Sequence, residues 1–280
     1  MEKKVPKVGL ALSGGATLGI AHVGVLKAFA DHKIPIDYIS GTSTGSLVAA
    51  CFAFGMPLSQ MIEITESLGW KKISKFGYSK LGINSNKPMS VFITDLLGDV
   101  KIEDAKIPLA IVATDIESYE MVVLREGSLH EAIRASTCIP GFFAPVELNG
   151  RMLVDGVLSE NLPLSPLYDM GATIKIGVNL SSNPVKARPQ NILEVIGNSY
   201  TVLSRHRDIN LNSRADVIIE PDLNKFDFTK FKDADQIVEE GYNAALKAIP
   251  EIQEKLSTHR EKKEGWLSEL LSFFTGKPQS

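Results

Sequence analysis

The chain has 280 residues, of which 44% are hydrophobic and 22% are charged, and its formal net charge is -3. This composition is that of a globular protein long enough for one large α/β domain or two small ones. The slightly acidic balance excludes a general electrostatic attraction to nucleic acid. The two cysteines, Cys51 and Cys138, match neither a disulfide framework nor a metal cluster, and they suit a reducing compartment.

The N-terminus carries basic residues ahead of an apolar run, as a secretory signal does, in the stretch MEKKVPKVGLALSGGATLGIAHVGVL. Glycines and His22 interrupt that run, and no small-residue cleavage site ends it. No uninterrupted apolar stretch reaches the length that spans a bilayer. We therefore expect a cytoplasmic protein.

Strand-like apolar runs alternate with helix-like patterns through the first third of the chain. We expect strands at residues 8–12 and 36–40 and helices at 20–30, 46–54, 58–68 and 89–97. Between the last two helices, residues 70–87 are rich in Lys, Gly, Ser and Asn, a composition typical of a mobile loop. Pro88 suits the first turn of the helix that follows.

Paired strands follow from Pro108 onward. The runs PLAIVATD and EMVVLREG predict two paired strands, and APVEL and RMLVD flank Asn149-Gly150, the best hairpin signal in the chain. Further helices are expected at residues 129–135, 191–211 and 234–256, and further strands at 172–180 and 215–220. Strands alternating with helices predict an α/β fold with a mainly parallel sheet covered on both faces. We expect one domain over residues 1–260 and a tail over 261–280.

A candidate nucleophile lies between the second strand and the second helix, where the chain reads Gly41-Thr42-Ser43-Thr44-Gly45. A G-x-S-x-G elbow needs this context, because its glycines let strand and helix approach around a strained turn that exposes the serine hydroxyl. The Thr44 amide, at the start of the helix, would then stabilise an oxyanion. The alternative is a loop serine that caps the next helix.

A nucleophilic serine needs a base, and Asp155 is the best-placed candidate. It ends the apolar strand RMLV, and Gly156 follows it. A carboxylate there could accept the serine proton, but its ordinary pKa makes it a weak base unless it is desolvated. The alternative is an Asp-Gly turn that only terminates the strand. A Ser-His-Asp triad is unsupported, because no histidine lies at a strand end near another candidate group; they are His22, His32, His130, His206 and His259.

A glycine-rich stretch at residues 13–19 also lies between a strand and a helix. Gly14 and Gly15 expose backbone N–H groups that suit an anion. With Ala16 in the third position, the stretch also fits a loosened dinucleotide-binding pattern, G-x-A-x-x-G. That pattern needs an acidic residue at the end of the second strand, where this chain has Ser40-Gly41-Thr42-Ser43. Nucleotide binding is therefore a lesser alternative, and no metal or organic cofactor is indicated.

Four motifs occur in one order across residues 8–156: LALSGGATLGIAHVGVL, GTSTG, ASTCIPGFFAPV and Asp155-Gly156. In this order they resemble the bacterial patatin-like phospholipases, a family of serine-aspartate lipid acyl hydrolases, and the similarity extends to about residue 221. The resemblance implies a three-layer α/β/α domain in which Ser43 is the nucleophile and Asp155 its partner. Gly14, Gly15 and Ala16 would fall in the oxyanion loop. The substrate that it implies is a lipid or fatty-acyl ester.

Three residues depart from the pattern of that family. The glycine-rich loop has Leu18 where the family usually carries Arg or Lys, and Ala16 where it usually has a third glycine. Val157 follows Asp155-Gly156 in place of Gly or Ala. These departures leave open a non-catalytic or weakly active lipid-binding protein that retains the fold. Intact Ser43 and Asp155 favour an enzyme, because a pure binder needs neither.

The C-terminal segment GWLSELLSFFTGK places apolar residues at helical spacing from Trp266 to Phe274, which gives one broad apolar face. Basic residues flank the segment on both sides. Two interpretations are open. The helix docks on the domain and covers an apolar patch, or it lies in a membrane interface, with its basic residues against anionic lipid at the inner face of the membrane.

Overall fold

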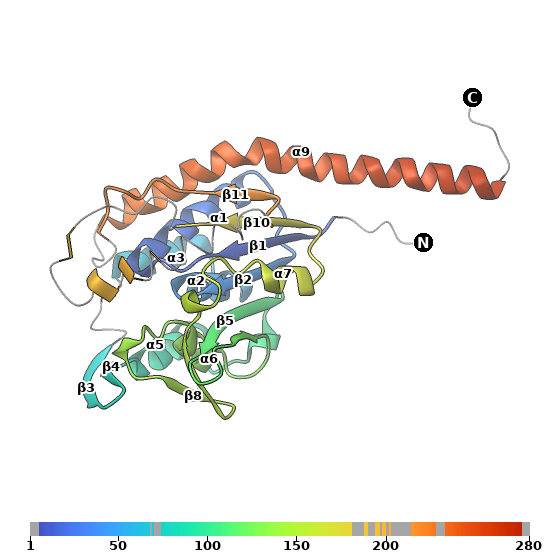
Figure 1. Ribbon diagram of the computed structural model, residues 1–280. Helices are drawn as coiled ribbons and strands as arrows, with labels where there is room; N and C mark the ends of the chain where they lie inside the picture. Colours follow the sequence, from blue (N-terminus) through green and yellow to red (C-terminus); the bar gives the residue numbers. More distant parts are fainter. Residues whose placement is uncertain are drawn as a thin grey trace.

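The computed structural model describes residues 6–67, 69, 74–180, 188–189, 194–196, 198–199, 202, 214–227 and 233–275. An eight-stranded sheet forms its centre, in the order β11-β10-β1-β2-β5-β9-β8, with β6 pairing with β5 (Figure 1). The strands are β1 (Val8–Leu12), β2 (Tyr38–Thr42), β5 (Leu109–Asp115), β6 (Met121–Leu124), β8 (Val146–Leu148), β9 (Arg151–Asp155), β10 (Ile174–Val178) and β11 (Val217–Ile219). All neighbours from β11 to β5 are parallel, whereas β6, β8 and β9 pair in antiparallel fashion. The predicted mainly parallel sheet is confirmed.

Apolar layers cover both faces of this sheet. The helices are α1 (Ala21–Asp31), α2 (Thr44–Ala53), α3 (Leu58–Ser67), α5 (Lys87–Leu97), α6 (Leu129–Ser136), α7 (Ser165–Asp169) and α9 (Ala234–Thr275), with short 3-10 turns η1 (Ala16–Ile20), η2 (Ile102–Asp104) and η3 (Gly156–Leu158). Leu10 and Leu12 on β1 belong to the main core with α1 and α9, while Ala11 between them packs with Leu162 and Leu167 on the opposite face. This alternation follows from the two-residue period of a strand.

Helix α9 lies across α1 at very close range (Figure 1). A Cβ atom on Gly24 would come within 1.9 Å of the Val238 carbonyl oxygen, and one on Gly241 within 1.9 Å of the Ala21 carbonyl oxygen. Glycine at both positions lets the two backbones touch. The crossing fixes α1, and therefore the glycine-rich turn before it, against the sheet.

The elements around Ser43 come closer to it than the sequence predicts. The strand expected to end at Ser40 continues through Gly41 and Thr42, because both residues pair with Ile111 and Val112 of β5. The helix expected from Ser46 begins at Thr44 instead. The turn is therefore reduced to Ser43 alone.

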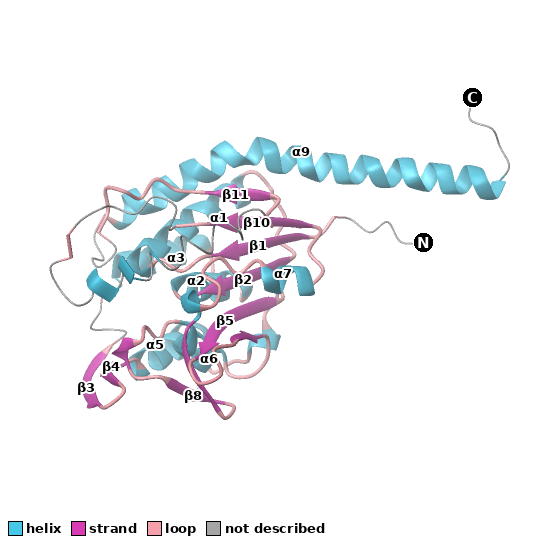
Figure 2. Ribbon diagram, viewed as in Figure 1, coloured by secondary structure: helices cyan, strands magenta, loops and turns pink. Residues whose placement is uncertain are grey.

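The prediction of a loop over residues 70–87 is wrong where the structure describes these residues. Strands β3 (Lys75–Ser79) and β4 (Gly82–Ser85) form a hairpin (Figure 2). Strand β4 also pairs in parallel with β7 (Gly141–Phe143), a strand that the sequence did not predict. Because this segment is rich in Lys, Gly, Ser and Asn, its composition does not show the pattern of a strand. Pairing with a distant partner supplies the hydrogen bonds that the local sequence does not indicate.

One predicted helix lies mostly outside the described residues, and another is longer than predicted. Most of the helix predicted over residues 191–211 lies outside the described residues. Helix α9 runs past residue 256, its predicted end, through the predicted domain boundary at residue 260 to Thr275. The side chains of the predicted amphipathic tail lie outside the described part of the chain, so the domain boundary and the role of the tail stay predictions. Among the described residues, no helix combines the length and apolar character needed to cross a bilayer.

Candidate active site

Ser43 forms the whole turn between β2 and α2. Its φ of 52° is positive, a conformation that a residue with a side chain adopts at a cost and that persists only where the surroundings enforce it. Those surroundings are two close approaches of backbone. A Cβ atom on Gly41 would come within 2.5 Å of the Gly45 carbonyl oxygen, and one on Gly45 within 2.2 Å of the Leu12 carbonyl oxygen. Both glycines are therefore needed to seat the helix on the strand at this sharp turn.

Ser136 supports the strained turn at Ser43 through a hydrogen bond, and it was not identified from the sequence. Its fully buried hydroxyl accepts a hydrogen bond from the Ser43 amide at 2.8 Å and donates one to the Val112 carbonyl at 2.7 Å. The Ser43 amide belongs to neither the strand ladder nor the helix, so a side chain must satisfy it. The signal lies in the motif ASTCIPGFFAPV, where Ser136 ends α6.

Asp155 lies at the end of β9 and contacts the hydroxyl of Ser43. Ser43 Oγ donates a hydrogen bond of 2.8 Å to Asp155 Oδ2, and the amide of Val157 donates to Oδ1 at 3.0 Å. The carboxyl group is 1% exposed. The structure thus brings together the two residues that the sequence selected as nucleophile and base.

Burial changes the acidity of this carboxyl group. Removal from water raises the pKa of Asp155 to about 7, although the hydrogen bonds from Val157 and Ser43 lower it in part. An ordinary aspartate is too weak a base to take a proton from serine. A carboxylate with a pKa near neutrality is matched to general-base work.

The glycine-rich loop lies directly beside Ser43. A Cβ atom on Gly14 would come within 3.1 Å of the Ser43 Cβ, and the Thr44 hydroxyl donates to the Ala16 carbonyl at 2.8 Å. The Gly14 amide donates to the Asn161 side chain, so it is already engaged. Within the described part of the chain, the amides of Gly15 and Ala16 donate no hydrogen bond, and Thr44 begins α2. These three amides are the candidate oxyanion donors.

His22 supports the same loop from inside the protein. Its ring is fully buried, and Nε2 lies 2.8 Å from the Ser13 carbonyl oxygen, so this nitrogen carries the proton. Burial lowers the pKa of His22 to about 4. Among the described residues, no histidine contacts Ser43 or Asp155. His22 is therefore part of the core beneath the loop.

The three departures from the family pattern occupy defined positions. Ala16 has a φ of 50°, in the region that favours glycine. Leu18 is partly buried and packs against the main core, so it contributes to packing at the position where the family usually has a cation. The Val157 side chain lies against the loop, since a Cβ atom on Gly14 would come within 2.7 Å of its Cγ2.

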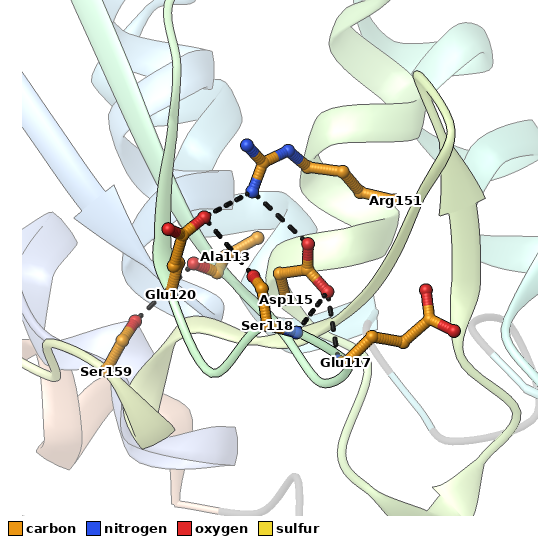
Figure 3. Close-up of polar contacts among 7 residues, drawn as sticks. All are labelled: Ala113, Asp115, Glu117, Ser118, Glu120, Arg151 and Ser159. Carbon is orange, nitrogen blue, oxygen red and sulfur yellow. Dashed lines mark hydrogen bonds and ion pairs between the residues drawn. The ribbon is translucent and has the colours of Figure 1, made fainter.

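A polar cluster at the start of β9 anchors the strand that carries Asp155 (Figure 3). Arg151 Nη1 lies 3.2 Å from Asp115 Oδ2 and 2.9 Å from Glu120 Oε2, which ties β9 to the turn between β5 and β6. The Glu117 amide, a second amide at Ser118 and the Arg151 charge all lower the pKa of Asp115. These contacts position the strand and do not reach the reacting groups.

Known proteins match the chain in both sequence and structure. A family model described as patatin-like phospholipase matches residues 10–168. An uncharacterised NTE family protein of Mycobacterium bovis is 35% identical over 181 residues, covering 64% of this chain and 50% of that protein. The lysophospholipase NTE1 of Yarrowia lipolytica is 30% identical over 181 residues, covering 62% of this chain and 13% of that protein.

The chain thus spans half the length or less of these relatives. In structure, VipD from Legionella pneumophila is similar with a TM-score of 0.60 and 12% identity, covering 89% of this chain and 67% of that one. At this identity the likeness concerns the fold.

Proposed function

The chain belongs to the patatin-like phospholipase family, and on this basis we propose that it is a serine esterase that cleaves carboxylic esters of lipids. The names of its relatives support a lipid substrate, and one of them is a lysophospholipase. The predicted catalytic pair is Ser43 and Asp155. The predicted oxyanion loop is refined to the amides of Gly15, Ala16 and Thr44.

The geometry supports a two-step acyl transfer. Ser43 Oγ attacks the ester carbonyl carbon while its proton passes to Asp155 Oδ2, which already accepts the hydrogen bond. The carbonyl oxygen becomes an oxyanion that the free amides stabilise. The C–O bond breaks, and the leaving alcohol takes the proton from Asp155. Water then attacks the acyl-enzyme, gives its proton to Asp155, and releases the fatty acid as Ser43 recovers its proton.

The single observation that carries the proposal is the buried contact between Ser43 and Asp155. A non-catalytic lipid-binding protein has no use for a carboxyl group that burial penalises, because a neutral residue would fill the position at lower cost. Groups with strongly shifted pKa values in contact with a nucleophile are typical of active sites.

Labelling with a fluorophosphonate probe, followed by peptide mapping, tests the proposal together with hydrolysis of a p-nitrophenyl ester. We expect Ser43 to carry the label and Ser43→Ala to lose both labelling and turnover while it remains folded. Ser40→Ala is the matched control, because the Ser40 hydroxyl is also buried, in the middle of β2, but donates to the Pro163 carbonyl. Wild-type turnover in folded Ser43→Ala would overturn Ser43 as the nucleophile, whereas neither labelling nor turnover in the wild-type protein would leave the non-catalytic lipid-binding protein as the remaining function.

A further inference from the structure

A basic and apolar surface covers the β3–β4 hairpin and the start of α5. We call it the hairpin surface and define it by Lys75, Lys80, Leu81, Ile83, Lys87 and Val91. The apolar side chains are well exposed: Leu81 is 58% exposed, Ile83 43% and Val91 61%. Leu81 and Ile83 lie on the hairpin and Val91 on α5. A group of exposed aliphatic side chains is typical of a surface that meets a partner.

The strand register puts Lys75 and Ile83 on one side of the hairpin. Lys75 lies opposite Ser85, and Ile83 lies two residues before Ser85, so all three share one face. The other face of β4 is covered, since a Cβ atom on Gly82 would come within 2.3 Å of the Ala144 amide nitrogen. On α5, Lys87 and Val91 are one helical turn apart and therefore point the same way.

The charge of this segment is one-sided in a protein that is acidic overall. Between Glu66 and Asp95 the sequence has five lysines and no acidic residue, against a net charge of -3 for the chain. Among the described residues, Lys75, Lys80 and Lys87 are exposed and form no ion pair. Unpaired lysines around aliphatic side chains match a negatively charged apolar interface.

The hairpin surface is joined to the elements that build the site. The Asn86 side chain, at the end of β4, donates to the Arg134 carbonyl at 2.7 Å, and Arg134 precedes Ser136 on α6. Strand β7, which pairs with β4, begins three residues after Cys138, whose carbonyl accepts from the Asp155 amide. Figure 1 shows the hairpin at the side of the molecule toward which the arrow of β1 points. Ser43 follows the last residue of β2, which runs parallel to β1, so it also lies at the carboxyl ends of these strands.

We propose that the hairpin surface docks this protein on an anionic lipid surface, so that the candidate active site faces its substrate. The aliphatic side chains enter the headgroup region, and the lysines meet lipid phosphates. This inference rests on the proposed function in one respect, namely that the substrate is a lipid. Vesicle binding and hydrolysis of a soluble ester are measured separately, so the failure of one does not imply the failure of the other.

Vesicle flotation tests the proposal with the full chain. We expect binding to vesicles of phosphatidylglycerol and phosphatidylcholine, and far weaker binding to phosphatidylcholine alone or in high salt. Lys80→Glu/Lys87→Glu should weaken binding to the anionic vesicles by at least about tenfold. Leu81→Ser/Ile83→Thr should weaken it as well. Both variants should keep the wild-type rate on a soluble ester and the wild-type melting temperature.

The matched control is Lys101→Glu/Lys106→Glu, which changes the net charge equally. Both lysines are exposed and precede β5, at the opposite end of the sheet. We expect binding within about twofold of wild type. Equal losses in the two charge-reversal variants, or binding that neither hairpin variant changes, would overturn the proposal. A dimer that Leu81→Ser/Ile83→Thr converts to a monomer, with vesicle binding intact, would make the surface an interface between copies instead.

Discussion

The hydroxyl of Ser43 donates directly to the carboxylate of Asp155 at 2.8 Å, and Asp155 is almost completely buried. In a serine-histidine site, an imidazole would lie between such groups and set the pH dependence. Here the carboxyl group itself is the candidate base, and its pKa of about 7 makes its protonation state sensitive to pH near neutrality.

The first prediction is that kcat/KM for a soluble ester rises through pH 7 and levels off above it, because only the ionised form of Asp155 accepts a proton. Asp155→Asn should lose nearly all turnover, and its residual rate should show no such rise. The buried histidine that contacts the loop, His22, has a pKa lowered by burial to about 4, outside this range. A rise near pH 7 that survives in Asp155→Asn would assign the titration to another group.

The second prediction concerns stability. The pKa of Asp155 is raised on folding from 3.8 to about 7, so between these values the native state holds a proton that the unfolded state has lost. Its contribution therefore favours the fold at low pH and declines as pH rises toward 7. At about 1.4 kcal/mol per pH unit, the interval amounts to about 4 kcal/mol.

Urea unfolding at a series of pH values checks this linkage. The difference in unfolding free energy between wild type and Asp155→Asn should shift in favour of the variant from pH 4 to pH 8. A constant difference across this range would mean that the carboxyl group titrates normally in the folded protein.

The third prediction is that Ser136 positions the nucleophile. Ser136→Ala leaves the buried Ser43 amide without its acceptor, which should cost roughly 1–3 kcal/mol of stability. Displacement of the hydroxyl should also lower kcat by about tenfold to a hundredfold, with little change in KM. Ser40→Ala removes a hydrogen bond from an equally buried serine that contacts neither Ser43 nor Asp155. It should lose stability but keep kcat, and an equal loss of kcat in both variants would reduce the role of Ser136 to packing.

The sequence indicated the parallel strands because each reads as an apolar run, and β1, β5 and β10 are indeed fully buried. It indicated Ser43 and Asp155 because each follows such a run. It did not indicate the Ser136 hydroxyl or the Asn161 side chain. Ser136 is 93 positions along the chain from its partner Ser43, and Asn161 is 147 positions from its partner Gly14. No local pattern encodes such contacts. The hairpin was missed for the same reason, since β4 finds its second partner in β7, far along the chain.

The fourth prediction concerns Ala16, whose positive φ favours glycine. Ala16→Gly should raise the unfolding free energy by about 0.5–1 kcal/mol, because relief of the left-handed conformation exceeds the added flexibility of the unfolded chain. The matched change Ala28→Gly, inside α1, should lower it instead by about 1 kcal/mol or more. Urea unfolding of both variants measures the signs. A loss of stability in Ala16→Gly would show that the Ala16 methyl group contributes more through packing than its conformation costs.

The last prediction separates the two interpretations of the tail. The backbone of α9 continues to Thr275, so the apolar residues from Trp266 to Phe274 lie along one helix. If that helix anchors the protein in a lipid interface, deletion of residues 265–280 should preserve the melting temperature and the hydrolysis of a soluble ester, and weaken binding to anionic vesicles. If it covers an apolar patch of the domain instead, the deletion should lower the melting temperature and leave vesicle binding unchanged. Combined with Lys80→Glu/Lys87→Glu, the deletion also shows whether two surfaces act together. Two independent contacts should lower the affinity for vesicles by the product of their separate effects, because their binding free energies then add.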